Sequence, residues 1–251
     1  CLYLSFIFMG RAVYLNPAKG TAVVRSVYLG QTKSNKRGQL MSRLLSHVLF
    51  VIAFLPLVAC QAAEEPYQAG VQYEVLPEPV STSDPSKVEI VEVFWYGCSH
   101  CYSFEPTIKS WLKTQKDVNF VGVPAVWQPV MRLHAKAYYT AKALKVLDTM
   151  NSVIFEAMNL KKQRLQSEDE IAALFVANGV SLERFTKVFN SGSIEMSVDL
   201  AEKKQARYRT KGTPELVVNG KYRISSREAG GHDGMLKVAS FLIEKERAQL
   251  K

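Results

Sequence analysis

The chain has 251 residues, 47% of them hydrophobic and 22% charged, with four cysteines and a formal net charge of +9. Seven of its 32 basic residues and none of its 23 acidic residues precede Gln61, so the remainder carries a net charge near +2. The basic balance therefore gives no reason to expect a nucleic-acid partner. The remainder is long enough for one domain with a sizeable core.

The first 62 residues have the features of a leader that is removed from the mature protein. Met41 is the best candidate for a translation start, and residues 1–40 look like upstream, non-native sequence rather than a genuine basic extension. Arg43 followed by the apolar stretch 48–59 is typical of a signal peptide, and the stretch is too short for a membrane span. We therefore expect a signal peptide over residues 41–62 and export of the protein.

The end of this leader leaves two mature forms open. Leu57-Val58-Ala59-Cys60 resembles a lipobox, in which Cys60 becomes lipidated and anchors the protein to a membrane. Cleavage after Ala62 by the general signal peptidase would instead release a protein without a lipid.

The first part of the remaining chain, residues 63–130, has the pattern of a β-α-β unit. Residues 88–95 are β-branched, aromatic and apolar on both faces, which indicates a buried central strand. A helix is predicted over residues 99–113 and a second strand over residues 119–123. The right-handed crossover rule makes the two strands a parallel pair.

Residues 131–209 have helical periodicity throughout, and we expect them to form a helical domain inserted into an α/β protein. A capping box, Ser167 with Glu170, marks the start of one of the helices. The apolar residues that recur at spacings of three and four are Leu133, Ala137, Ala141, Leu144 and Leu147, then Ile171, Leu174 and Phe175, then Leu182, Phe185 and Phe189.

The last part, residues 210–251, returns to strands. Residues 215–218 and 222–225 flank Asn219-Gly220, a strong signal for a tight hairpin. An amphipathic helix is predicted over residues 233–249.

Cys98 and Cys101 are the two cysteines that we expect the mature protein to retain. Their spacing closes a loop too small to stabilise a fold, so chemistry explains the pair better than a structural disulfide. A zinc half-site is the other alternative, but the available His134 and His232 do not have metal-ligand spacing. We expect no metal and no cofactor, and we expect thiol-disulfide redox chemistry.

Cys98 stands where the predicted central strand ends and the next helix begins. Unpaired backbone N–H groups and the helix dipole at that position favour a thiolate, and His100 can add a donor or a positive charge. A stabilised thiolate is also a good leaving group, so the disulfide becomes easy to reduce and the protein a strong oxidant. Cys98 is then the nucleophile and Cys101, carried inward by the first turn, the resolving thiol.

Glu92 and Pro214 each have two interpretations. An acid in an apolar central strand is expensive to bury, so Glu92 either relays protons behind the cysteine pair or faces solvent near the strand end, as Glu89 would. The Thr213-Pro214 bond follows Gly212, and most bonds before proline are trans.

Three stretches resemble the DsbA family of periplasmic disulfide oxidoreductases, namely EVFWYGCSHCYSFEP at 92–106, GTPELVVNGKYR at 212–223 and LIEKER at 242–247. The resemblance extends over residues 64–248 and is weaker in the helical middle. It implies a thioredoxin-like fold with an inserted helical domain, and the introduction of disulfide bonds into exported proteins with free cysteines. It also implies reoxidation by a DsbB-type membrane oxidase, and we expect the protein to be a monomer.

The resemblance also implies roles for single residues. Cys98 corresponds to the attacking cysteine, His100 to the residue that stabilises its thiolate, and Glu92 to the family's buried acid. Pro214 corresponds to the cis-proline beside the active site, with Thr213 before it in a substrate-binding position.

Two alternatives stay open. Ser99 stands where many relatives have proline, and Thr213 where many have valine, and both positions influence redox direction. A disulfide isomerase or reductase of the thioredoxin superfamily is therefore the first alternative. A peptide-binding holdase with incidental cysteines is the second, and the aromatic run 94–96 beside the pair would support it.

Overall fold

The computed structural model describes β1 (Tyr14–Leu15), β2 (Ala22–Val23) and residues 65–250. β1 and β2 pair in antiparallel fashion within a unit that is separate from the unit of residues 63–251. The expected signal peptide and Cys60 lie outside the described residues.

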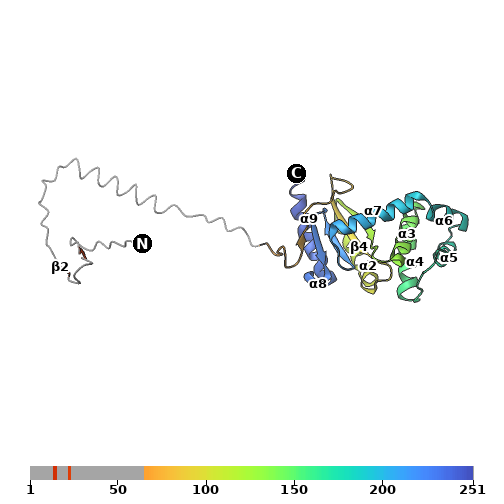
Figure 1. Cartoon of the computed structure of the whole chain (residues 1–251), viewed down its shortest axis with the longest axis horizontal. Coiled ribbons are helices and arrows are strands. Elements are labelled where there is room, and N and C mark those ends of the chain that lie inside the picture. The colour runs from red at the N-terminus through yellow and green to blue at the C-terminus, as the bar shows by residue number, and fades with distance from the viewer. Residues whose placement is uncertain (1–13, 16–21, 24–64, 251) are drawn as a thin grey trace. The chain divides into compact units, whose positions relative to one another are not determined.

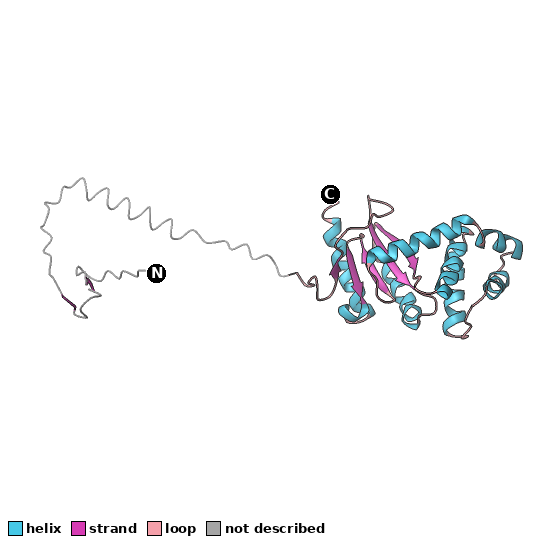
Figure 2. Cartoon of the chain, in the orientation of Figure 1, coloured by secondary structure: helices cyan, strands magenta, loops and turns pink. Residues whose placement is uncertain are grey.

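A mixed sheet forms the centre of the second unit (Figures 1 and 2). It has five strands in the order β3-β7-β6-β4-β5. The parallel β4–β5 pair confirms the β-α-β prediction, and the antiparallel β6–β7 pair confirms the hairpin. All seven residues of β4 are buried. The strands are β3 (Glu74–Val75), β4 (Val88–Phe94), β5 (Val118–Pro124), β6 (Glu215–Val218) and β7 (Tyr222–Ser225).

Helices cover both faces of this sheet because β4 is apolar on both sides. Val88 and Ile90 face a core that includes α2 (Ser99–Leu112) and α9 (His232–Arg247). Val91 and Val93, which alternate with them, pack in a second core with residues of α3 (Pro129–Ala143) and α7 (Gly192–Tyr208). Glu92 has the parity of Ile90, so it points to the α2 face. A short helix, α8 (Ser226–Ala229), precedes α9.

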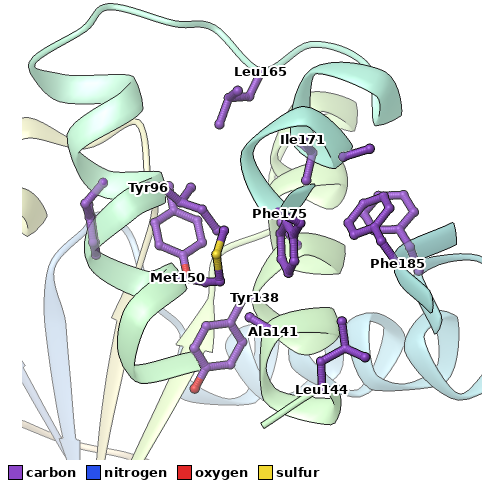
Figure 3. Packing of buried hydrophobic residues seen from close by; sticks show 14 of the residues in the cluster. Tyr96, Tyr138, Ala141, Leu144, Met150, Leu165, Ile171, Phe175 and Phe185 are labelled. Carbon is purple, nitrogen blue, oxygen red and sulfur yellow. The ribbon is translucent and has the colours of Figure 1, made fainter. Parts of the chain in front are cut away.

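The helical insertion lies beside the sheet, and its last helix runs back toward the strands (Figure 1). Its core contains the aromatic residues Phe155, Phe175, Phe185 and Phe189, and Figure 3 shows how several of its members pack. The helices are α3 (Pro129–Ala143), α4 (Leu147–Asn159), α5 (Glu168–Ala177), α6 (Leu182–Phe189) and α7 (Gly192–Tyr208).

One detail of the helical prediction is wrong. The apolar spacing that continues from Leu133 to Leu147 does not belong to one helix, because Lys145 has a φ of 61° and breaks the backbone there. Leu144 is the C-cap residue that follows α3, and Leu147 begins α4. Ser167 does cap α5, with its hydroxyl accepting a bond from the Glu170 N–H at 3.2 Å.

The hairpin turn gives a stability prediction. Asn219 and Gly220 have φ values of 50° and 63°, and a Cβ added at Gly220 would lie 1.9 Å from the Val80 carbonyl oxygen. Gly220→Ala is therefore expected to lower the free energy of unfolding by about 2 to 4 kcal/mol. The loss combines backbone strain at the positive φ with displacement of the segment around Val80. Denaturant unfolding measures this loss.

Gly179→Ala is the matched control for the Gly220 variant. Gly179 also has a positive φ, of 87°, but a Cβ there meets nothing within 4 Å, so only the backbone contribution is lost. Equal losses in the two variants would show that the contact with Val80 has no energetic weight.

Candidate active site

Cys98 and Cys101 lie at the junction of β4 and α2, as the sequence predicts. Cys98 is the N-cap residue of α2, with φ −88° and ψ 114°, and its Sγ accepts a hydrogen bond from the Cys101 N–H at 3.3 Å. Both are free thiols in this structure, Cys98 half-buried and Cys101 fully buried. At this position Cys98 receives a hydrogen bond from a backbone N–H that has no partner within the helix, and its sulfur stays accessible to a substrate.

The two thiols ionise very differently. A hydrogen bond from the Cys101 thiol lowers the pKa of Cys98 to about 5, and the Thr213 side chain and the N–H groups of Cys101 and His100 add to this against the cost of burial. Burial, followed by the bond to Cys98 and the charge there, raises the pKa of Cys101 far above the ordinary thiol value. Cys98 is therefore the thiolate at neutral pH, and Cys101 stays protonated.

The His100 side chain is exposed and faces a second imidazole. The rings of His100 and His232 meet edge to face with centroids 6.4 Å apart, and His232 also lies 4.7 Å from the ring of Phe104. Burial, and then the charge of His100, lower the pKa of His232. The sequence places His232 one residue before the predicted last helix and has no signal that brings it to the cysteine pair.

Glu92 is buried, with 5% of its surface exposed, and one of its carboxylate oxygens has no partner. Burial, then the charges of Glu105 and Cys98, raise its pKa to about 8. The surface alternative for Glu92 is therefore wrong. It is wrong for Glu89 too, which is 1% exposed and accepts bonds from Ser83. Both acids are buried because β4 is covered on its two faces.

A cleft of about 440 Å³ leads to Glu92, and Glu105 and Lys109 of α2 also line it. Lys109 and Glu105 form an ion pair of 2.8 Å within the cleft wall. Asn151 of α4 donates to Glu105 and accepts a 2.8 Å bond from the Tyr96 hydroxyl. This link between the insertion and the cysteine segment was not predicted, because its members are some 50 residues apart in the sequence.

The Thr213-Pro214 peptide bond is cis, which confirms the family-based prediction over the trans expectation. The bond lies against the reactive sulfur, since Cys98 Sγ is 3.3 Å from the Thr213 carbonyl oxygen, to which it donates a hydrogen bond in its protonated form. The structure thus places Thr213, which precedes Pro214, beside Cys98, although the two residues are 115 positions apart in the chain.

His134 serves the structure of the insertion rather than a metal. Its Nδ1 accepts from the Trp95 indole N–H at 2.9 Å, so its Nε2 carries the proton for the 3.0 Å bond to the Leu165 carbonyl. Among residues 65–250, no three His, Cys, Asp or Glu side chains are placed to share a metal ion.

The comparisons with known proteins decide the family. Residues 89–242 match the model of the DSBA-like thioredoxin domain. The thiol:disulfide interchange protein DsbA of Pseudomonas aeruginosa is 39% identical over 202 residues, which cover 80% of this chain and 96% of that protein. This chain belongs to the DsbA-like thioredoxin family. Its relative DsbA of Pseudomonas syringae pv. tomato is 37% identical over 212 residues, covering 84% of this chain and 99% of that protein.

Solved DsbA structures have the same fold. The crystal structure of Pseudomonas aeruginosa DsbA is 40% identical in sequence and superposes with a TM-score of 0.70. The match covers 73% of this chain and 96% of the DsbA chain. The oxidoreductase DsbA from Xylella fastidiosa is 32% identical, with a TM-score of 0.68, over 72% and 98% of the two chains. This member of the DsbA-like family is a periplasmic thiol:disulfide oxidoreductase. Within the described residues, no helix has the length and apolar character needed to cross a membrane.

Proposed function

We propose that the oxidised protein introduces disulfide bonds into exported proteins through a Cys98-Cys101 disulfide. A substrate thiolate attacks Cys98 Sγ, the bond between the two enzyme sulfurs breaks, and Cys101 leaves. A second substrate thiolate then attacks the substrate sulfur of this mixed disulfide, and Cys98 leaves as a thiolate. The substrate loses two electrons, and the enzyme gains them as one thiolate and one thiol.

The contrast between the two thiols is the observation that carries this proposal. With a pKa of about 5, Cys98 is a stable leaving thiolate at neutral pH, which favours release of the oxidised substrate. The pKa of Cys101 is strongly raised, so this sulfur needs a proton as it leaves. Glu92, whose pKa is about 8, still holds a proton at neutral pH and is the group we assign to supply it.

His100, Thr213 and Pro214 complete the proposed site. The N–H of His100 contributes to the low pKa of Cys98, and we assign to its exposed imidazole a further stabilisation of the thiolate. The backbone of Thr213 lies next to Cys98, where its polar groups can pair with an extended substrate segment. Pro214 has no N–H, so it offers the sulfurs no donor.

Three finer features belong to the same proposal. Residues 41–62 act as the signal peptide, and the mature enzyme works as a monomer. A DsbB-type membrane oxidase restores the Cys98-Cys101 disulfide. Intact mass of the protein from membrane and soluble fractions distinguishes lipidation at Cys60 from cleavage after Ala62.

The test is oxidation of a reduced peptide that contains two cysteines, with the fully oxidised protein in slight excess. We expect one peptide disulfide for each enzyme molecule reduced. A protein that reduces insulin faster than it oxidises the peptide would be a reductase or isomerase. A protein that does neither and still suppresses aggregation would be a holdase.

Replacing Cys101 by serine is expected to build up mixed disulfides with exported proteins. The Cys98 thiolate can still attack a disulfide of an exported protein and release one substrate thiolate, but no second enzyme thiol remains to resolve the adduct. Non-reducing gels of periplasmic extract, with mass spectrometry of the bands, measure the adducts. If Cys98→Ser traps substrates as well as Cys101→Ser, the assignment of Cys98 as the attacking thiol is wrong.

A further inference from the structure

A buried ion pair lies immediately behind the loop that carries Thr213. Glu215 and Arg223 are 3% and 2% exposed, and Arg223 Nη1 donates to both carboxylate oxygens of Glu215 at 3.2 Å. Arg223 Nη2 contacts Glu74 Oε2 at 2.5 Å, which connects β7 to β3. The guanidinium thus lies between two carboxylates, one buried and one at the sheet edge.

The Glu215 carboxylate also holds the loop itself. Its Oε1 accepts a hydrogen bond from the Lys211 N–H at 3.2 Å. Glu215 follows Pro214 and is fixed in the sheet, where it pairs with Val93 of β4 and Ser225 of β7. The residues between Lys211 and Glu215 are therefore closed into a small ring by one side chain.

Stability alone does not account for charges at these two positions. A buried ion pair loses about as much in desolvation as it gains in attraction, and apolar residues of similar volume often serve a fold equally well. Burial does raise the pKa of Glu215, against the attraction of Arg223. An apolar side chain, however, could not accept the Lys211 N–H.

We propose that Glu215 and Arg223 are positioning residues, which hold the loop of residues 211–214 so that the Thr213 backbone lies against Cys98. Arg223 fixes the carboxylate, the carboxylate fixes Lys211, and the loop between them presents the carbonyl that contacts the reactive sulfur. The inference rests on the proposed substrate-binding role of Thr213.

The test compares Glu215→Leu with the double variant Glu215→Leu/Arg223→Met. The single variant leaves a buried guanidinium with only the outer carboxylate and is expected to lose stability as well as activity. The double variant removes both charges, so its stability is expected to recover. Both lack the acceptor for Lys211, and we expect kcat/KM for peptide oxidation to fall at least tenfold in both, mainly through KM. The pKa of Cys98 is expected to rise in both, because the displaced loop no longer holds the Thr213 side chain where its hydrogen bond stabilises the thiolate.

Two further variants act as controls. Glu215→Gln keeps an oxygen acceptor for the Lys211 N–H, so its KM is expected to stay close to the wild-type value. Glu246→Gln disrupts another buried acid, which binds Asn219, Lys221 and Tyr222 at the far end of β6. It is expected to lower stability without changing KM or the pKa of Cys98.

The outcomes separate the positioning role from its alternatives. If the double variant recovers activity together with stability, or if Glu246→Gln loses as much activity, the pair acts only through the fold and the inference is overturned. If the wild-type protein itself does not oxidise the peptide, the proposed function fails instead. In that case the titration of Cys98 in the double variant still tests the position of the loop.

Discussion

Replacing Cys98 by serine is expected to lower kcat/KM for oxidation of a dithiol peptide by at least about 1,000-fold, because no enzyme disulfide can form. Cys98 is only half-buried, so a substrate thiolate can reach its sulfur. Its low pKa makes it a good leaving group when the mixed disulfide is resolved. A stopped-flow assay of peptide oxidation measures the loss. Far-ultraviolet circular dichroism shows whether the variant is folded.

Ser110→Ala is the matched control for that variant, since Ser110 is exposed on the same helix. It is expected to retain wild-type activity. A Cys98→Ser protein with more than a tenth of wild-type oxidation would refute the disulfide mechanism and leave the cysteines incidental.

The second large effect is on the pH dependence of stability. Relative to the Glu92→Gln variant, the reduced wild-type protein is expected to lose about 4 kcal/mol of stability between pH 4 and pH 8. The pKa of Glu92 is about 8 in the folded protein and near 4.5 in the unfolded chain. Between these values the folded state holds a proton that the unfolded state releases, so rising pH favours unfolding. Glutamine has the same shape and no proton to release.

Urea unfolding at pH 4 and pH 8 measures this difference. Glu246→Gln is the contrasting variant, because hydrogen bonds from Lys221, Asn219 and Tyr222 lower the pKa of Glu246 although burial opposes them. A carboxylate with a lowered pKa stabilises the fold above its unfolded value, so this variant is expected to lose stability near neutral pH. Parallel pH profiles for wild type and Glu92→Gln would show that Glu92 ionises normally.

The elements around the cysteine pair could be predicted because local patterns determine them. An apolar run on both strand faces, a helix start at Cys98 and the Asn219-Gly220 turn each depend on neighbouring residues. The break at Lys145 could not be predicted, since the apolar spacing continues across it and only the backbone shows the change of direction.

The chemistry-bearing residues divide in the same way. Cys98 and Cys101 belong to one short motif, with two residues between them, and Glu92 stands out as an acid in an apolar strand. His232 and the Glu215–Arg223 pair meet their partners only through the tertiary fold. Charged residues in a short strand normally indicate a solvent face, so nothing local shows that Glu215 is buried or that it holds the loop before it.

Titration of the Cys98 thiolate in the reduced protein, followed by its absorbance at 240 nm, tests the central claim most directly. The structure predicts a single transition with a midpoint near pH 5, and no second thiol transition through pH 9, because Cys101 remains protonated. His100→Ala in the same titration is expected to raise the midpoint. A wild-type midpoint near 9, the ordinary value for a thiol, would contradict the account, because Cys98 would then be neither a stabilised thiolate nor a good leaving group.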